Sequence, residues 1–527
     1  MASEGLEFDR SAAASTAAND VQPSGSSSDH WSGRSSQRTL ELAFLAAFAL
    51  VVGVTIWRHE MWRDELQAWT LTNASDGLRD LLHNLRYEGH PTLWYLLLFP
   101  LTRLTNAPEA MQLLQFVVAI ATGALIVRFA PFTLAQRAML LFGYFVVFEF
   151  GTLARSYGLG VMFVVGVCVI ANRSKRSWSW IGLLLALLAL TSAFGAMLAV
   201  AIGAGLVVDE LARRRSDDPR AASLQSLAGG ATLALGGVIV AYAQSIPPAD
   251  AGEYRGWRTS FEAGEVATTV AAVWRAFVPI PQLQREFWNT NVLDGRAGIA
   301  AAVSIALVAL VAWVFRHKPA ALAIWGLGLG MLLVFLYAKI AYASSGRHLG
   351  HLFLLFVAIC WLAPSLVTTD ENPQLRSSPV ERRAVLLTVI LGLHVVAGAF
   401  AVVSDWTTPF SDGRAVAEYI NTNDLHDSVI IGFPDTAAST VAGYLQRDVY
   451  FTQGSRFGNF IIWDTRRIDP AQPLREILSE FASVDGPGVL ILRTEPLDVV
   501  PENVELLEVF DDGIVTDEHY WLYTLRR

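Results

Sequence analysis

Long apolar runs limit what this chain can fold into more than any other feature of its sequence. Eleven segments hold almost no charged side chains: 39–57, 110–129, 137–153, 156–172, 178–192, 194–211, 224–246, 297–315, 320–340, 349–367 and 384–404. An apolar helix of about 20 residues can cross a bilayer, because a helix satisfies its own backbone hydrogen bonds in lipid. The sequence therefore predicts a polytopic α-helical membrane protein with about eleven spans.

The composition agrees with a membrane protein and argues against other classes. Only 17% of the residues are charged, whereas soluble proteins carry about 25%. The net charge of −9 does not favour nucleic acid as a partner, because its binding needs a basic face. Cys168 and Cys360 lie far apart inside apolar runs, so we expect them to pack as small apolar residues and to form no metal site.

A shorter apolar stretch, residues 92–104, contains Pro100 and either crosses the membrane or enters and returns. The Lys and Arg residues decide between these alternatives. With eleven spans and a cytoplasmic N-terminus, basic clusters such as Arg213-Arg214-Arg215 fall on cytoplasmic connections, as the positive-inside rule requires. A twelfth crossing would move nearly all of these clusters outside, so we expect eleven.

The predicted organisation follows from this count. It comprises a disordered cytoplasmic tail (1–38), a transmembrane domain (39–404) with outer loops 58–109 and 247–296, and an extracytoplasmic C-terminal domain (405–527). The tail is rich in Ser and Ala and has little to bury. No apolar segment follows Met1 directly, so we expect no cleaved signal peptide and a signal anchor at the first span. The predicted location is the plasma (inner) membrane.

The C-terminal region changes character, because short apolar strands alternate with helical segments. The predicted strands are 428–433, 449–451 and 488–492, and the predicted helices are 414–423, 436–445 and 473–482. This alternation predicts a small three-layer α/β domain with a partly parallel sheet, and the late segments VELLEVF and YWLYTL are expected to form an antiparallel edge. Pro434-Asp435-Thr436 follows the first strand in place of a glycine-rich loop, so nucleotide binding is not expected.

The strongest candidates for chemistry are Asp64 and Glu65, which begin a predicted interfacial helix after the first span. Tryptophans that include Trp62 and Trp69 flank them, as is typical of headgroup depth. A carboxylate there can accept a proton from a hydroxyl, and the pair could hold a divalent cation such as Mg²⁺ or Mn²⁺. Alternatively, the pair caps the helix, whose N-terminus favours anions.

Further candidates lie at the predicted outer ends of other spans. His90 ends the first outer loop, as either a surface residue or part of a site. Glu149, near the outer end of an apolar helix, is costly there without a partner. It either pairs with Arg155, the alternative that we favour, or lines the cavity. Neither residue identifies a reaction by itself.

A polar group at the outer end of the ninth and tenth spans includes Arg347 and His348, with Lys339 two turns earlier. Arg347 could bind a phosphate through its two-pronged guanidinium, with His348 hydrogen-bonding beside it. The alternative for Arg347 and Lys339 is that they extend toward lipid headgroups. Residues of lower rank are Tyr254, Trp257 and Arg258 in the second loop and Asp435, Arg456, Asp464 and Arg466 in the terminal domain.

Several of these motifs match a known pattern. Asp64-Glu65 followed by residues 90–95 (HPTLWY) resembles the "DE … HPPLYY" signature of the GT-C glycosyltransferases, with threonine for the second proline. Residues 154–159 (ARSYGL) are similar to the "ARPYAL" element of that superfamily, again without its proline. Residues 191–195 (TSAFG) lie where many members have "THxxG", but the histidine is absent. The resemblance covers residues 40–210, and the superfamily includes protein O-mannosyltransferases and aminoarabinose transferases of lipid A.

The resemblance implies a polyprenyl-phosphate sugar donor and an acceptor at the outer face, which is a cell-envelope glycan, a lipid or a protein. It implies that Asp64 is the general base, with Glu65 in support. The residues expected to bind the donor phosphate or sugar are His90, Arg155, Tyr157, Arg347, His348 and Lys339. Two other hypotheses remain open at this point: a transporter or flippase of lipid-linked sugar, and a non-catalytic membrane scaffold.

Overall fold

The computed structural model describes residues 27–252, 258, 260–340, 345–369, 377–467, 474–482 and 488–526, with backbone alone for 27–36 and 377–380. The chain divides into two compact units, Met1–Ala43 and Phe44–Arg527. Of the expected disordered tail, residues 1–26 lie outside the described part, whereas residues 27–38 belong to helix α1 (Ser27–Arg58). The features discussed below lie in the second unit.

Seven helices of the described residues are long and apolar enough to cross a membrane. They are α1, α5 (Glu109–Phe129), α9 (Ala193–Arg215), α10 (Leu224–Gln244), α12 (Ala297–Val314), α13 (Pro319–Ala338) and α15 (Ser377–Thr407). Shorter apolar helices accompany them: α4 (Leu93–Thr102), α7 (Ser156–Ala171), α8 (Trp178–Ala189) and α14 (Gly346–Leu362). These helices make the chain an integral membrane protein, as the sequence predicts, but the count of eleven spans is not confirmed.

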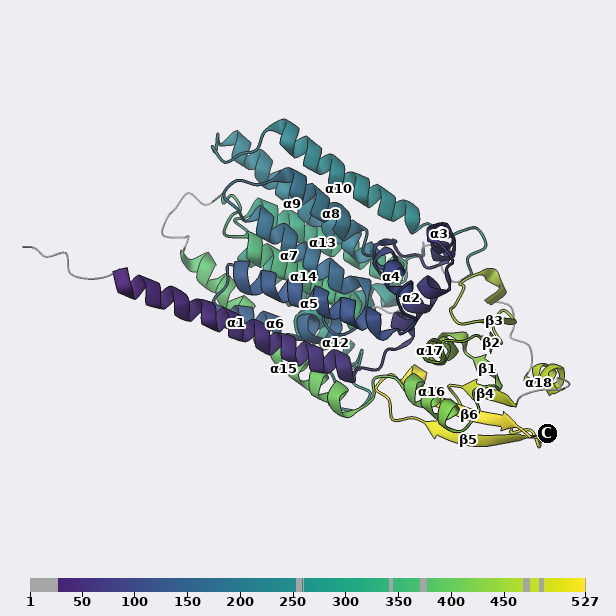
Figure 1. The fold of residues 1–527 in the computed structure, drawn as a ribbon. Coiled ribbons are helices and arrows are strands. Elements are labelled where there is room, and N and C mark those ends of the chain that lie inside the picture. The colour runs from purple at the N-terminus through teal and green to yellow at the C-terminus, as the bar shows by residue number, and fades with distance from the viewer. Residues whose placement is uncertain are drawn as a thin grey trace, which may run out of the picture. The chain divides into compact units, whose positions relative to one another are not determined.

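Close helix packing depends on small residues in this bundle. Helices α8 and α10 run side by side (Figure 1). A Cβ atom on Gly182 of α8 would lie 2.2 Å from the carbonyl oxygen of Gly230 in α10. Glycine at such a contact lets two backbones approach, which is how membrane helices gain packing contacts when lipid offers no hydrophobic drive.

Two segments differ from, or refine, the expected spans. Residues 137–153 do not form one helix: α6 (Leu134–Leu141) ends, and a π-helical turn η2 (Phe145–Glu149) follows. The wider turn is closed by the bond from the amide of Phe150 to the carbonyl of Phe145 (2.9 Å), and such turns are frequent at functional sites. Helix α4 has ten residues and rises about 15 Å. Because the hydrocarbon core is about 30 Å thick, α4 alone is too short to cross it.

The two long connections also contain short helices. The first has α2 (Arg63–Ala74), α3 (Leu78–Asn84) and η1 (Leu85–Tyr87) before α4, and the second has α11 (Ala263–Ala272) and η3 (Val273–Ala276). Helix α2 is almost entirely buried, and it contacts both α4 and the C-terminal domain. A buried helix in the first connection therefore lies where its N-terminal residues can meet side chains from several parts of the chain.

The C-terminal domain has one six-stranded sheet in the order β3-β2-β1-β4-β6-β5. Its elements are α16 (Gly413–Thr422), β1 (Val429–Phe433), α17 (Asp435–Leu445), β2 (Val449–Phe451), β3 (Arg456–Gly458), η5 (Thr465–Arg467), α18 (Leu474–Ala482), β4 (Val489–Arg493), β5 (Val504–Phe510), η6 (Thr516–Glu518) and β6 (Tyr520–Leu525). Strand β1 is parallel to β2 and β4, and β3, β6 and β5 are antiparallel additions. The predicted strands and helices are confirmed, and β3 was not foreseen.

The sheet is covered on both faces, which makes the three layers expected from the sequence. One face packs Ile430, Leu490 and Leu492 against α16 and α17, and the other packs Ile431 and Ile491 against α18. Figure 1 shows α17 and α18 on opposite sides of the strands. Successive strand residues point to opposite faces, so the continuous apolar runs VIIGF and VLILR supply both cores.

Candidate active site

Asp64 lies where three elements meet. It is the second residue of α2, and its Oδ2 atom is 2.7 Å from Nη1 of Arg155 and 3.5 Å from Nη2 of Arg347. Arg155 directly precedes α7, and Arg347 is the second residue of α14. The Asp64 side chain keeps 26% of its surface exposed. The structure thus brings together three residues that are 91 and 192 positions apart in sequence.

The two guanidinium groups set the charge of this carboxylate. Burial alone would raise the pKa of Asp64, but Arg155, Arg347 and Arg63 outweigh that effect and lower its pKa to about 2. Opposite charges within a few ångströms favour the ionised form of an acid. Asp64 is therefore a carboxylate at any physiological pH.

Tryptophan rings pack against the guanidinium groups of both arginines. The guanidinium carbons of Arg155 and Arg347 lie 5.9 and 5.1 Å from the ring centre of Trp62. Trp288 packs edge-on against Trp62 at 4.7 Å and lies 5.7 Å from Arg347. Cation–π contacts of this kind hold a guanidinium flat without occupying its hydrogen-bond donors. Sequence reasoning placed Trp62 only at headgroup depth and missed Trp288.

Glu65 has a different environment from its neighbour, although both begin α2. Its side chain is fully buried, and it accepts from the amides of Ala154 (2.6 Å) and Trp62 (3.3 Å). Its Oε2 atom is also 3.0 Å from Nε2 of His59. Glu65 therefore has the helix-capping role that was the alternative for the acidic pair. It also connects the start of α2 to Ala154, the residue just before Arg155.

His59 continues this buried chain of contacts to the last spanning helix. Its two ring nitrogens lie 3.0 Å from Glu65 and from Asp405, and all three side chains are inaccessible to solvent. Burial would lower the pKa of His59, but the two carboxylates raise it well above the usual value. A protonated His59 consequently joins α2 to α15.

Glu88 is a functional candidate that the sequence analysis did not single out. It is buried, accepting from Gln67 (2.8 Å) and Tyr95 (3.4 Å). Burial raises its pKa to about 7, and the nearby Asp64 adds to the rise. The sequence feature that could have identified Glu88 is its position two residues before His90.

His90 itself is half-buried, and its Nδ1 atom is 2.6 Å from the carbonyl oxygen of Glu88. Its pKa is lowered by burial and by Arg155. The Nδ1 atom therefore donates, and the Nε2 atom of the neutral ring is an acceptor. Its electrostatic coupling with Arg155 and Asp64 puts His90 in the same cluster.

Two other predicted site residues lie beside the arginines of this cluster. The Arg155 guanidinium lies 5.0 Å from the ring centre of the buried Tyr157. His348, next to Arg347, is buried and stacks on Phe194 at 4.9 Å. Lys339 follows the last residue of α13, and its role stays a prediction.

The expected pair of Glu149 and Arg155 is wrong. Glu149 accepts from the Tyr144 hydroxyl (3.0 Å) and from the Trp288 indole (3.2 Å), while Arg155 pairs with Asp64. Glu149 ends the π-helical turn η2, and its Oε2 atom is taken by Tyr144 and Trp288, while the Arg155 guanidinium is drawn to the carboxylate of Asp64. Glu149 holds Trp288 in place beneath Arg347.

The fold of this chain is similar to that of a solved structure. ArnT from Cupriavidus metallidurans, bound to undecaprenyl phosphate, superposes with a TM-score of 0.50 over 92% of this chain and 97% of that chain, at 12% sequence identity. The chain has the GT-C fold. The fold that the motifs implied is thereby confirmed, although no family model and no curated protein matches the sequence significantly.

A second solved structure aligns with this chain over part of its own length. Arabinofuranosyltransferase AftD from Mycobacteria aligns at 13% identity and a TM-score of 0.34. The alignment covers 92% of this chain but only 40% of AftD.

The C-terminal domain holds α2 in place through buried hydrogen bonds. Glu518, fully buried, accepts from the amide of Arg63 (2.8 Å) and from the hydroxyls of Ser411 (2.5 Å) and Thr440 (3.1 Å). Gln67 exchanges two hydrogen bonds with the backbone of Ile461 (2.8 and 2.9 Å). The residue that precedes Asp64 is therefore fixed from a domain about 450 positions away.

The remaining candidates lie elsewhere. In the terminal domain, Asp435 forms an ion pair with Arg467 (2.5 Å), and Asp464 pairs with Arg456 (3.2 Å) and Arg466 (2.9 Å). Their suggested role in binding an acceptor stays a prediction. Tyr254 and Trp257 lie outside the described residues, and Arg258 pairs with Glu265 (3.3 Å).

Proposed function

We propose that this protein is a glycosyltransferase that moves a sugar from a polyprenyl-phosphate donor to an acceptor hydroxyl at the membrane surface. The observation that carries the proposal is a partly exposed Asp64 held between Arg155 and Arg347 at the junction of α2, α7 and α14. A GT-C fold shared with a protein that binds undecaprenyl phosphate supports it.

The arginines suit the donor. A polyprenyl tail stays in the bilayer, so its phosphate is presented at headgroup depth. Arg155 and Arg347 offer two planar guanidinium groups, which bind phosphate oxygens in pairs. Arg347 also stands in the first turn of the 17-residue helix α14, where the helix dipole favours an anion.

The reaction would be a single displacement that inverts the anomeric carbon. The acceptor oxygen bonds to that carbon, and the bond from the carbon to the phosphate oxygen breaks with its electron pair left on the phosphate. Asp64 takes the proton of the acceptor hydroxyl as general base. The products are the glycosylated acceptor and polyprenyl phosphate, whose developing charge the arginines stabilise.

Donor binding would also activate the base. With a pKa of about 2, Asp64 is a weak base while both arginines face it, because a general base works best near the operating pH. The donor phosphate competes for the same guanidinium groups and places negative charge beside the carboxylate. Both effects raise the pKa of Asp64, so the base becomes effective only when the donor is present.

The other residues would act around this pair. We propose that Glu65 positions α2 and Arg155, since all its contacts are structural, and that Tyr157 and His348 shape the donor site. His90, through its Nε2 atom, and Lys339 are proposed to contact the sugar or phosphate. For the residues proposed to contact the donor, substitution should weaken donor binding. Substitution of the buried Glu65 should also destabilise the fold, because it leaves His59 without one of its partners.

The acidic pair does not fit a shared divalent cation. Both oxygens of Glu65 already accept hydrogen bonds, and Oδ2 of Asp64 faces two guanidinium groups. Within the described ranges, no group of three or more His, Cys, Asp or Glu side chains is arranged to hold a metal ion. We therefore derive the chemistry from the arginines.

We further propose that the cluster faces the exoplasmic side. Helix α9 joins Phe194, which stacks on His348, to Arg213 near its other end. Nineteen residues of helix rise about 28 Å, close to the 30 Å hydrocarbon core. The basic run Arg213-Arg214-Arg215 at the far end is typical of a cytoplasmic boundary, which supports an exoplasmic position for Asp64 and the C-terminal domain.

The test compares Asp64→Asn with the wild type in proteoliposomes. A labelled polyprenyl-phosphate sugar and an acceptor extract are supplied, and both transfer and donor binding are measured. Asp64→Asn should lose transfer but bind the donor at least as tightly, because the arginines lose a competing anion. Arg347→Gln should lose donor binding.

The matched control is Asp76→Asn, which removes an exposed carboxylate from the same connection. It should transfer sugar like the wild type. Full activity of Asp64→Asn would contradict the proposed base, and transport of the labelled lipid without transfer would favour a flippase.

A further inference from the structure

A pocket of about 280 Å³ opens in the C-terminal domain at the carboxyl ends of β1 and β4. Its lining is Ile431, Phe433, Thr452, Leu474, Ile477, Ile491, Leu492 and Arg493. In the sheet, β2, which follows β1 in sequence, lies on one side of β1, and β4 lies on its other side. The pocket therefore lies at the switch point of the sheet, where ligands of open α/β domains bind.

The walls of the pocket are apolar and rigid. Ile431, Ile477 and Ile491 are almost completely buried and come from β1, α18 and β4. The pocket is partly open, and it has room for on the order of ten water-sized groups. A pocket of this size beside a sheet is suited to the apolar body of a small ligand.

Two polar groups at the pocket have unused capacity. The Thr452 side chain is 95% buried, and its hydroxyl has no hydrogen-bond partner among the described residues. The Arg493 guanidinium lies 5.5 Å from the ring of Phe433, and its Nε atom donates to the carbonyl of Glu495 (3.3 Å). Within the described part of the chain, no carboxylate pairs with the terminal nitrogens of Arg493.

These contacts select the charge of the ligand. Among the lining residues that the structure describes, Arg493 alone is charged, so these residues offer one positive charge and one hydroxyl. A carboxylate carries a single negative charge and matches the fork of an arginine, whereas a phosphate monoester carries about −1.5 to −2 near neutral pH. One cation with a buried hydroxyl fits the carboxylate better.

We propose that this pocket binds a small amphiphilic carboxylate, with its chain between β1, β4 and α18 and its head on Arg493 and Thr452. The site is separate from the Asp64 cluster, because the sheet lies between the pocket on the α18 face and α17, which contacts α2, on the other face. The inference does not depend on sugar transfer.

The experiment uses the full chain in lipid nanodiscs and octanoate with a photoreactive diazirine on its chain. After irradiation and proteolysis, mass spectrometry locates the label. We expect labelled peptides from 429–433, 474–482 or 489–493, and we expect octanoate to displace the probe at least tenfold better than octanol, because the head carries the charge-assisted contact.

Two variants test the polar contacts. Arg493→Gln should weaken displacement by octanoate about tenfold, and Thr452→Val about threefold, as expected for a charged and a neutral hydrogen bond. The matched control is Arg526→Gln, which removes an exposed arginine paired with Glu505 near the same sheet. It should label like the wild type.

The outcomes separate clearly. Equal displacement from wild type and Arg493→Gln, displacement by octanol as strong as by octanoate, or labels spread over the membrane helices would each overturn the proposal. Size-exclusion profiles and circular dichroism establish that each variant is folded before its labelling is compared.

Discussion

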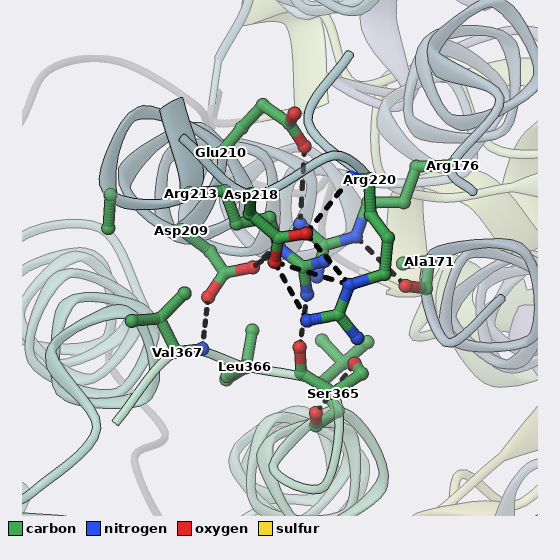
Figure 2. A network of polar contacts seen from close by, with 12 residues as sticks. Ala171, Arg176, Asp209, Glu210, Arg213, Asp218, Arg220, Ser365, Leu366 and Val367 are labelled. Carbon is green, nitrogen blue, oxygen red and sulfur yellow. Dashed lines mark hydrogen bonds and ion pairs between the residues drawn. The ribbon is translucent and has the colours of Figure 1, made fainter. Parts of the chain in front are cut away.

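Two clusters in this protein use the same residue types, an aspartate between two arginines, in opposite ways. Asp209 of α9 is 1% exposed, and its Oδ2 atom lies 2.8 Å from both Arg213 and Arg176. Its Oδ1 atom accepts from the amide of Val367 (2.6 Å). Figure 2 shows this carboxylate enclosed by its partners. Asp64, in contrast, keeps a quarter of its surface exposed.

The difference lies in what satisfies each carboxylate. Backbone groups complete the Asp209 network, since Val367 donates to Asp209 and Arg213 donates to the carbonyl of Ser365. No amide of the described residues donates to the Asp64 carboxylate, and tryptophan rings support its arginines. A carboxylate that is bonded to backbone groups holds the loops that carry those groups. A carboxylate that is bonded only to side chains can release them when a ligand binds those side chains. We infer that the first cluster stabilises the fold and the second does chemistry.

The largest expected effect is on catalysis. Asp64→Asn should lower the transfer rate by about 10³-fold, within the usual contribution of a general base, while the unfolding temperature changes little. Radiolabelled transfer and a thermal unfolding scan on the same preparation check both statements. A transfer rate within twofold of the wild type would remove the distinction between the two clusters.

The converse effect is expected at the other cluster. Asp209→Ala leaves Arg213 buried without its carboxylate and leaves Arg176 with only the longer contact to Glu210 (3.6 Å). Loss of one partner of a buried ion pair costs about 3–5 kcal/mol. The unfolding temperature should fall steeply, and the transfer rate of the protein that remains folded should stay near that of the wild type. Asp218→Asn, which breaks an exposed pair with Arg220, is the control and should have almost no effect.

An intermediate effect is expected at Glu518, which connects the C-terminal domain to the helix that bears Asp64. Glu518→Ala leaves the amide of Arg63 and two hydroxyls without their acceptor, which should destabilise the protein by about 1–3 kcal/mol. Because α2 would be less well positioned, the rate constant should fall with donor affinity preserved. Steady-state kinetics, with donor binding measured separately, distinguishes a lower rate constant from a lower donor affinity. An effect on donor affinity alone would contradict a positioning role.

The smallest expected effect is a pH dependence of stability. Burial raises the pKa of Glu88 from its usual 4.5 to about 7, so the folded chain holds a proton that the unfolded chain loses first. The stabilisation is complete below about pH 4.5 and is lost as pH rises to about 7. Glu88→Gln cannot titrate and should flatten this slope in unfolding temperatures measured from pH 4 to pH 8.

Glu518 titrates in the same direction, with its pKa raised by burial to about 7. The slope should therefore be reduced by Glu88→Gln and not abolished. An unchanged slope would show that Glu88 is ionised in the folded state. The double variant with Glu518→Gln should be flatter still.

The sequence by itself determined the features that depend on neighbouring residues. Apolar runs identified the membrane domain, because each helix must satisfy its own backbone in lipid. Alternating strand and helix segments gave the terminal sheet, including its parallel pairs and antiparallel edge. The position of Asp64 at the start of a helix was also a local property.

Only the tertiary structure decided which distant groups meet. It gave Asp64 its two arginines and gave the adjacent Glu65 a buried structural role, although the two residues share one local sequence. It also placed Trp288 beside Trp62 and broke the expected helix at 137–153. Burial and the charges of residues from remote helices determine the pKa and the role of an ionisable side chain. Neither can be deduced from the residues next to it in sequence.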